Sequence, residues 1–331
     1  MHSKKILVFI VFFIIVSKNV LADNTTPINH LNISCYSELS PAMADELVID
    51  NLTIVFSKNK KWVKNLFNIH KEFEIKKNES EHKNWFSNFR INKKFKKKFK
   101  ANVLVKFKDY KECKFKAKVR ITGDLWWHLG WKKGAPISSV HIKLLDGNLY
   151  NVTQFKLFLK EARNGKNEVF VSNLFKELGF ISPKTFLLNA KINNIDHEYI
   201  FQEDIRKELL ESSFYREGPL LEGDERYTVN LSDKEQSNFP VVSFAKVVNA
   251  NFLRKNKSNS IAGLEALSNM NRLYLYNHDY KLSKTTSETS DDLYLFTNKF
   301  FSEKNSKILN TYEALAYALD VEHGLSMDDR R

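Results

Sequence analysis

The chain has 331 residues, of which 43% are hydrophobic, so its length and composition predict one large domain or two modest ones with a sizeable core. This composition excludes a wholly disordered chain. The formal net charge of +13 predicts a surface that attracts nucleotides, acidic glycans, lipid headgroups or nucleic acid, and the charge alone does not choose among them.

The first 22 residues have the pattern of a signal peptide. Lys4 and Lys5 precede an apolar run from residue 6 to 16, and Val20 and Ala22 place small residues at the −3 and −1 positions of a cleavage site. The run is shorter than the ~20 residues of a membrane span, and no later segment is long and apolar enough to cross a bilayer. We therefore expect a soluble mature chain that is exported to the periplasm or the extracellular space.

The chain contains two cysteines, Cys35 and Cys113, both in the exported part. An oxidising compartment favours a disulfide between them. Their separation matches no metal-site spacing, and two buried free thiols are the alternative.

Residues 23–110 predict a β-rich segment with one helix. Residues 46–57 alternate as a strand, and residues 60–71 carry an apolar stripe at helical spacing. Alternation from Phe99 onward predicts a further strand within the basic segment 93–109. No aromatic-and-glycine RNA-binding signature or helix-turn-helix pattern accompanies these lysines, so we expect a solvated strand face and no nucleic-acid partner.

A glycine-containing loop follows the strictly alternating strand at residues 114–122. Gly123, Gly130 and Gly134, with Lys132 and Lys133, could fold over the phosphates of a ligand. Because the glycine spacing matches no standard nucleotide fingerprint, a long hairpin whose tryptophans fill the core is an equal alternative. The segment 138–145 then predicts a second strand.

The next elements place charged side chains in a recognisable order. Residues 154–159 predict a strand carrying Lys156, and residues 167–178 predict a helix with Asn167 as N-cap, Glu168 in the first turn and Gly179 after its end. A strand lysine and a helix-start glutamate are each usually solvated. In this order they match the lysine–glutamate pair that positions nucleotide phosphates in protein kinases.

Two further strands complete the pattern. TFLLNAKIN and HEYIFQED predict a hairpin that turns at Asn193 and Asn194, and Glu203 and Asp204 stand where its second strand ends.

Residues 118–225 resemble the spore-coat CotH-type kinase family, which comprises atypical secreted kinases. The similarity runs through KVRITGD, SVHIKLL, FKLFL, NEVFVSNLFKELGFISPKTF and KINNIDHEYIFQED. It implies an α+β, protein-kinase-like fold with a β-rich N-lobe at 111–215, including an αC-like helix, and a mostly helical C-lobe at 216–331.

The resemblance also implies roles for individual residues in binding Mg²⁺ and ATP. Lys156 would hold the α- and β-phosphates and Glu168 would orient it. Glu203 would lie beside the adenine. The loop from Gly123 to Gly134 would cover the phosphates, with Lys132 and Lys143 as further cofactor-binding lysines. The bulky Trp126, Trp127 and Trp131 depart from the small polar residues that this loop often has in the family.

The C-terminal segment would complete catalysis. A helix at residues 308–319 leads into DVEHGLSMDDRR, where the resemblance implies Asp320 or His323 as the catalytic residue and Asp328 and Asp329 as metal ligands. A kinase also needs a metal-ligand aspartate on a following strand, so we expect residues 216–331 to form an incomplete C-lobe. The acidic residues Glu222, Asp224 and Glu225 would form either a metal or substrate shelf or an exposed loop.

Two functions stay open from the sequence. The first is an exported phosphotransferase that uses Mg-ATP on a protein or glycan hydroxyl. The second is a non-catalytic envelope or surface protein that binds an acidic glycan or a protein partner through a basic groove. A glycoside hydrolase is a remote third, because nothing in the sequence brings two carboxylates, such as Glu203 and Glu222, to face each other.

Overall fold

The computed structural model describes residues 48–79, 89–108, 112–224, 244–284 and 302–319. All the described residues belong to one compact unit. None of the described helices is long and apolar enough to span a bilayer. Cys113 is buried on a strand, whereas Cys35 lies outside the described residues, so the predicted disulfide stays a prediction.

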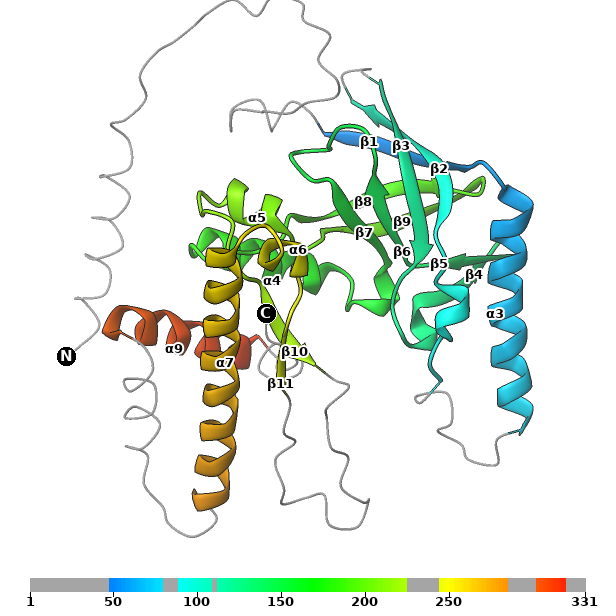
Figure 1. Ribbon diagram of the computed structural model, residues 1–331. Helices are drawn as coiled ribbons and strands as arrows, with labels where there is room; N and C mark the ends of the chain where they lie inside the picture. The colour runs from blue at the N-terminus through cyan, green and yellow to red at the C-terminus, as the bar shows by residue number, and fades with distance from the viewer. Residues whose placement is uncertain (1–47, 80–88, 109–111, 225–243, 285–301, 320–331) are drawn as a thin grey trace, which may run out of the picture. The chain divides into compact units, whose positions relative to one another are not determined.

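A closed, seven-stranded β-barrel forms the centre of the fold (Figure 1). Its spatial order is β1-β2-β3-β6-β7-β9-β8, and β8 returns to β1. The closing pair β1–β8 is parallel, whereas every other neighbouring pair is antiparallel. The bounds are β1 Ile49–Phe56, β2 Phe99–Phe107, β3 Glu112–Ile121, β6 Val140–Leu144, β7 Gln154–Leu159, β8 Thr185–Ile192 and β9 Ile195–Glu203.

The barrel follows from strict alternation of apolar and polar residues. On β3 the side chains of Phe115, Ala117 and Val119 are buried, while the lysines between them are exposed. Aromatic rings fill the interior, where Phe201 stacks between Phe155 and Phe186 with ring centroids 4.6 and 4.5 Å apart. Burial of these apolar faces at about 25 cal/mol per Å² drives closure of the sheet.

The other described strands and helices lie outside the seven-stranded barrel. They are α3 Asn59–Glu79, η2 Lys93–Phe95, η3 Trp126–His128, β4 Leu129–Lys132, β5 Ala135–Ser138, η4 Lys160–Ala162, α4 Lys166–Glu177, α5 Lys207–Ser212, β10 Leu221–Asp224, β11 Phe244–Val247, α6 Ala250–Leu253, α7 Lys257–Lys284 and α9 Glu303–Ala318. β4 pairs only with β5, and β10 pairs only with β11.

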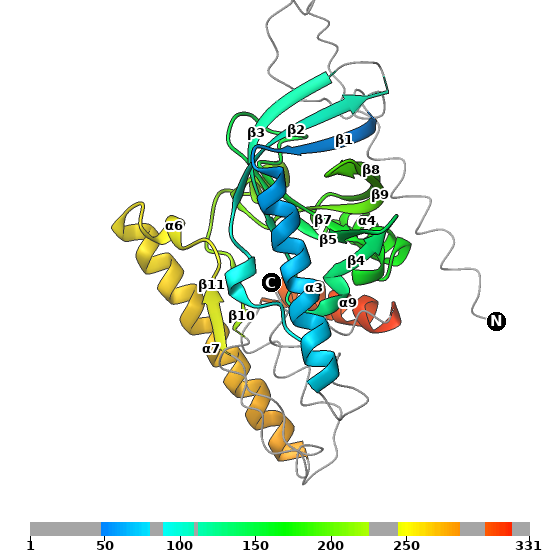
Figure 2. The same ribbon diagram turned by 90° about the vertical axis from the view of Figure 1, so that its right-hand side faces the viewer.

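Helix α3 packs against the barrel and the β4–β5 hairpin (Figures 1 and 2). Trp62 of α3 is fully buried and stacks on Phe56 of β1, with ring centroids 4.3 Å apart. One turn further along, Phe67 and His70 contact the ring of Trp131 on β4. The helix therefore holds the β4–β5 hairpin against the barrel.

Helix α4 begins slightly earlier than its sequence predicts and ends where predicted. Gly165, with a φ of 59°, is the N-cap in place of Asn167. At the other end Gly179 adopts a φ of 86°, and the N–H groups of Gly179 and Phe180 donate to the carbonyls of Lys176 and Phe175. This Schellman arrangement satisfies the last carbonyls of the helix, and the Phe175 and Phe180 rings pack beside it.

The predicted protein-kinase-like, two-lobed fold is wrong. The sheet closes into a barrel, because β1 pairs with β2 on one side and with β8 on the other. The strand at residues 49–56 therefore belongs to the same sheet as the strands assigned to a kinase N-lobe. The prediction of a kinase lobe rested on the order of strands and helices along the chain, and that order carries no information about a long-range parallel pairing that closes the sheet.

Candidate anion-binding site

A cavity of about 440 Å³ lies where β3, β7 and the end of β9 meet β10 and α7. Its charged lining comprises Arg120, Lys156, Asp204, Arg206 and Glu222, and apolar residues such as Leu221 and Met270 complete the wall. The volume is typical of sites for small molecules. We call this cavity the basic pocket.

Sheet register sets the positions of the two barrel cations. Arg120 on β3 lies opposite His141 on β6, and His141 lies opposite Lys156 on β7. Residues that face each other across neighbouring strands point to the same side of the sheet. The register therefore places Arg120, His141 and Lys156 in one row on the outer face of the barrel, directed away from the apolar core.

Asp204 is the acidic centre of the pocket. His141 Nε2 lies 3.3 Å from Asp204 Oδ2, Arg206 Nε donates to the same oxygen at 3.0 Å, and Lys156 Nζ lies 3.4 Å from Oδ1. Burial opposes ionisation of Asp204, but the hydrogen bond from His141 and the charges of Lys156 and Arg206 outweigh it and hold its pKa well below the usual range. The carboxylate is therefore ionised at neutral pH and holds the cations in place.

Cationic groups outnumber the carboxylates available to them. Arg120 has no carboxylate within ion-pairing distance among the described residues, and its guanidinium makes only a 3.5 Å contact to the Ile121 carbonyl. Glu222 forms an ion pair with Lys246 at 2.9 Å. Because three cationic side chains, Arg120, Lys156 and Arg206, line the pocket together with only two carboxylates, Asp204 and Glu222, the pocket presents a positive field to a ligand.

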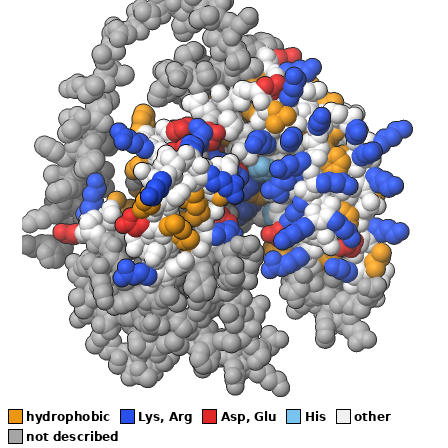
Figure 3. Space-filling view, viewed as in Figure 1, with side chains coloured by type: hydrophobic (Ala, Val, Ile, Leu, Met, Phe, Trp, Pro, Cys, Tyr) orange, Lys and Arg blue, Asp and Glu red, His pale blue; other side chains and the backbone are white. Residues whose placement is uncertain are grey.

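A row of lysines continues this field across the barrel. Lys118 on β3 lies directly opposite Lys100 on β2 and Lys143 on β6, and all three side chains are exposed. Like charges directly opposite each other destabilise a sheet. Lysine and arginine side chains dominate the surface of the barrel region (Figure 3). We call Lys100, Lys118 and Lys143 the lysine row.

Lys156 and Glu168 have different partners. Glu168 on α4 accepts a hydrogen bond from Gln202 Nε2 at 2.6 Å, while Lys156 forms its ion pair with Asp204. Gln202 lies opposite Lys156 in the sheet register. The structure thus brings the predicted lysine and glutamate to neighbouring positions and links Glu168 to the strand next to Lys156.

Glu203 does not line the basic pocket. Its side chain is 2% exposed and points to the inside of the barrel, where Lys184 Nζ lies 3.6 Å from Oε2 and the Lys184 N–H donates to the same oxygen. Burial raises the pKa of Glu203 despite the charge of Lys184. The neighbouring Asp204 faces the opposite side and is the residue that meets the cations.

The loop from Gly123 to Gly134 forms η3 and the β4–β5 hairpin. Trp126 packs against the core but Trp131 is exposed, so the tryptophans of the loop do not all fill the core as the hairpin alternative predicts. Lys133 and Gly134 have positive φ angles of 50° and 73° and make a two-residue turn. A Cβ on Gly123 would lie 1.9 Å from the His128 ring. Lys132 Nζ lies 3.2 Å from His197 Nδ1. Lys132 therefore lies outside the basic pocket.

The described residues contain no group of three or more His, Cys, Asp or Glu side chains that could hold a metal ion. Glu222 and Asp224 lie on β10, and Glu222 is engaged by Lys246. The remaining predicted catalytic and metal-binding residues lie outside the described residues; they are Asp320, His323, Asp328 and Asp329, and Glu225 of the acidic segment lies outside them as well.

The sequence analysis did not identify two residues that line the pocket, Arg120 and Arg206, or His141, which contacts Asp204. The alternation of β3 places Arg120 on the same face as Lys118, but the sequence does not show which strand pairs with β3, so it does not show that Arg120 lies next to His141.

No protein-family model matches the chain, and no curated protein matches it.

Proposed function

We propose that this protein binds an acidic glycan without modifying it, and that the basic pocket and the lysine row form the binding surface. The grouping of three cationic side chains, Arg120, Lys156 and Arg206, in one pocket carries this proposal. The carboxylate of Asp204 holds two of them, Lys156 and Arg206. Guanidinium groups bind carboxylate, sulfate and phosphate through paired N–H donors, and ammonium groups add charge with less directional demand.

The extent of the surface favours a chain with repeated negative charges. Neighbouring strands lie about 4.8 Å apart, so the three lysines span roughly 10 Å across β2, β3 and β6. Arg120 follows Lys118 on the same face of β3, which connects the row with the pocket. A small anion would occupy the pocket alone, whereas an acidic polysaccharide would contact both.

Binding of a heparin hexasaccharide to the mature chain tests the proposal. We expect saturable binding by calorimetry that weakens as salt rises, because exposed ion pairs are screened. Arg120→Gln should weaken binding about tenfold, and Lys118→Gln with Lys143→Gln should do the same. The charge-matched control is Lys304→Gln with Lys307→Gln on α9, which should bind like the wild type. Equal losses in both double variants would contradict a defined surface.

Phosphotransfer from Mg-ATP to a protein or glycan hydroxyl is the second candidate. The surroundings of Lys156 favour it. Lys156 forms an ion pair with Asp204, and Glu168 accepts a hydrogen bond from Gln202, which lies opposite Lys156 in the sheet. The phosphates would lie against Lys156 and Arg120, while the residues assigned to Mg²⁺ lie outside the described part of the chain. ATP would supply the phosphoryl group, and Mg²⁺ would neutralise its charge.

Thermal denaturation with ATP, with and without Mg²⁺, separates the two functions. The glycan-binding proposal predicts at most a small, Mg²⁺-independent stabilisation by ATP that competes with heparin. Magnesium-dependent stabilisation that is lost in Lys156→Ala, together with transfer of the labelled γ-phosphate, would replace glycan binding with the second candidate.

A further inference from the structure

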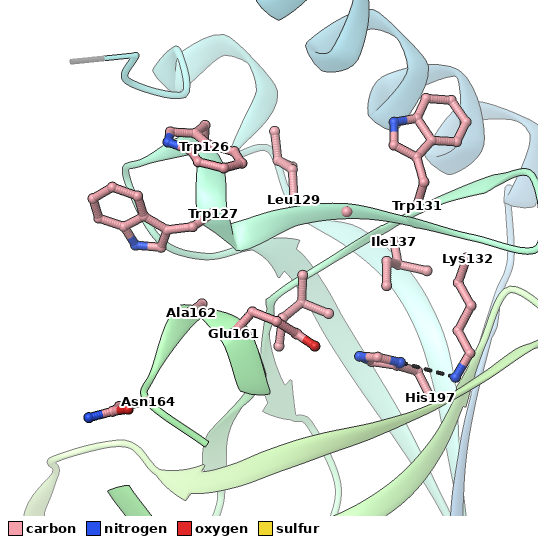
Figure 4. Close-up of a pocket in the computed structure, with 12 residues that line it drawn as sticks. Trp126, Trp127, Leu129, Trp131, Lys132, Ile137, Glu161, Ala162, Asn164 and His197 are labelled. Atoms are coloured by element: carbon pink, nitrogen blue, oxygen red, sulfur yellow. Dashed lines mark hydrogen bonds between the residues drawn. The ribbon is translucent and has the colours of Figure 1, made fainter. Parts of the chain in front are cut away.

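A second, larger cavity of about 690 Å³ lies at the other end of β7 and β9 from the basic pocket (Figure 4). The β4–β5 hairpin covers one side, and η4 with the turn after it forms the other. Its lining includes Trp127, Gly130, Lys132, Glu161, Asn164 and His197. None of these residues belongs to the basic pocket. We call this second cavity the tryptophan pocket.

The three tryptophans of the segment 126–131 differ in their packing. Trp126 stacks on Phe73 of α3 at 5.9 Å and packs against the core. Trp131 contacts Phe67 and His70 of the same helix. The ring contact of Trp127 is to the edge of Trp126 at 6.3 Å, and its half-buried side chain lines the cavity. All three indoles line the cavity. Those of Trp126 and Trp131 also pack on α3 and anchor the hairpin, whereas Trp127 packs on the edge of Trp126.

Small and aliphatic residues form an apolar part of the cavity wall, which we call the floor. A Cβ on Gly130 would lie 3.3 Å from Ile137 Cγ1 and 3.7 Å from Leu159 Cδ1. Glycine at this position therefore keeps the strand backbone close to both side chains and leaves no projection into the cavity. Ala162 continues the wall from η4.

Polar groups of both kinds surround this floor. Glu161 supplies carboxylate acceptors, and Asn164 supplies an amide at the tip of a turn where its φ is 53°. Burial lowers the pKa of His197, so its ring is neutral at neutral pH and Nδ1 can accept from Lys132. His197 Nε2 then carries a proton, and it has no hydrogen-bond partner among the described residues. In Figure 4 this nitrogen is turned towards the side where Glu161 lies.

We propose that the tryptophan pocket binds a neutral sugar ring of a glycan. A pyranose has an apolar C–H face and a rim of hydroxyl groups that both donate and accept. The indole of Trp127 and the floor at Gly130 and Ile137 match the C–H face. Around them, the carboxylate of Glu161 can accept hydrogen bonds from the sugar hydroxyls, the ammonium of Lys132 can donate to them, and the amide of Asn164 can do both.

The charge balance selects against other ligands. Lys132 and Glu161 contribute one charge of each sign, so the lining offers no net attraction to an anion or a cation. A lipid chain would offer no hydrogen-bonding group to Glu161 or Asn164 at its edge. The proposal does not depend on anion binding at the basic pocket, since the two cavities share no lining residue.

Titration of the mature chain with chitohexaose, cellohexaose and maltohexaose tests this site. We expect at least one of them to bind saturably by calorimetry and to change the tryptophan fluorescence. Saturation-transfer NMR should then show the strongest transfer to the axial C–H protons of the sugar ring. Trp127→Ala should weaken binding about tenfold or more, and Trp127→Phe should retain part of the affinity.

Two further substitutions keep the test independent of folding. Glu161→Gln and Asn164→Gly leave the core untouched, and glycine tolerates the positive φ at position 164. Each should weaken the same oligosaccharide severalfold. Tyr317→Ala on α9 is the matched control for loss of an exposed aromatic ring, and it should bind like the wild type.

The outcomes also separate this site from the proposed function. Lys118→Gln with Lys143→Gln should leave neutral oligosaccharide binding unchanged, and Trp127→Ala should leave the heparin affinity of the basic pocket within about twofold. The absence of saturable binding by all three oligosaccharides overturns the proposal. If Trp127→Ala and Glu161→Gln both bind the oligosaccharide as tightly as the wild type does, the proposal is overturned as well.

Discussion

The ammonium of Lys156 lies 3.4 Å from Oδ1 of Asp204, and this ion pair joins β7 to the residue that follows β9. The same carboxylate accepts from Arg206 and from His141. The backbone N–H of Asp204 donates to the Gln154 carbonyl at 2.9 Å. Asp204 thus fixes the orientation of the pocket cations before any ligand arrives. Its charge at the same time offsets part of the positive field that a ligand would meet.

Asp204→Asn should lower stability and tighten anion binding. Removing one partner of a largely buried ion pair leaves charges uncompensated, so we expect a loss of about 3 kcal/mol in the free energy of unfolding, measured with urea. The lost negative charge should at the same time increase heparin affinity. Asp196→Asn, at an exposed pair with Lys191, is the control and should change stability by about 0.5 kcal/mol or less.

The stability difference between wild type and Asp204→Asn should depend on pH. The pKa of Asp204 is lowered in the folded state, so its stabilising contribution is present above the ordinary value of 3.8 and is lost as the pH falls below it. The two proteins should therefore converge in stability in acid. A difference that stays constant from pH 7 to pH 3 would contradict the ion-pair explanation.

Acid should destabilise the protein through His128 as well. Burial lowers the pKa of His128 from 6.5 to about 4, and Nδ1 lies 3.1 Å from Ser139 Oγ. The unfolded chain binds the proton first, so stability falls as the pH drops from 6.5 towards 4, by about 3 kcal/mol for this group. His128→Asn should remove most of this slope, measured by urea unfolding at pH 7 and pH 5. An unchanged slope would assign it to other groups such as His141.

Glu203→Gln should stabilise the protein at neutral pH. The Oε1 atom has no hydrogen-bond partner among the described residues, and burial raises the pKa of the carboxyl above 4.5. The folded state thus prefers the protonated form, and stability is lost as the pH rises above that value. We expect a gain on the order of 1 kcal/mol at pH 7 that disappears near pH 4. A loss at pH 7 would show that the Lys184 interaction outweighs burial.

Two glycines with nearly equal backbone angles should differ in their tolerance of alanine. Gly123 and Gly179 have φ angles of 83° and 86°, which cost a side-chain-bearing residue about 1–3 kcal/mol. A Cβ at Gly179 would meet nothing within 4 Å, whereas at Gly123 it would overlap the His128 ring. Gly123→Ala should therefore be clearly less stable than Gly179→Ala in thermal unfolding. Equal losses would mean that the backbone alone sets the cost.

Local patterns in the sequence predicted the individual elements well. The alternation of residues 114–122 predicts β3, and Asn193 and Asn194 predict the turn between β8 and β9, where both residues have positive φ angles. Gly179 predicts the end of α4. Each of these signals acts between residues that are close in sequence, where steric limits and hydrogen bonds decide the conformation.

Long-range pairing decided what the sequence could not predict. The parallel contact of Leu52, Thr53 and Ile54 with β8 closes the sheet, and neither strand carries a residue that specifies it. The basic pocket depends on the register of β3, β6 and β7. Arg120 belongs to the site because this register puts His141 between Arg120 and Lys156, and the sequence does not predict the register. The tryptophan pocket likewise requires η4 and the β4–β5 hairpin to meet in space.

The closing pair of the barrel has a consequence for how fragments of this chain would behave. A fragment that starts at residue 111, the predicted start of a kinase lobe, would lack β1 and β2 and would leave β3 and β8 as open edges. Such edges pair readily with other chains. During synthesis of the whole chain, the edge of β1 stays open until β8 has left the ribosome, so a nascent chain would need protection from aggregation until that strand emerges.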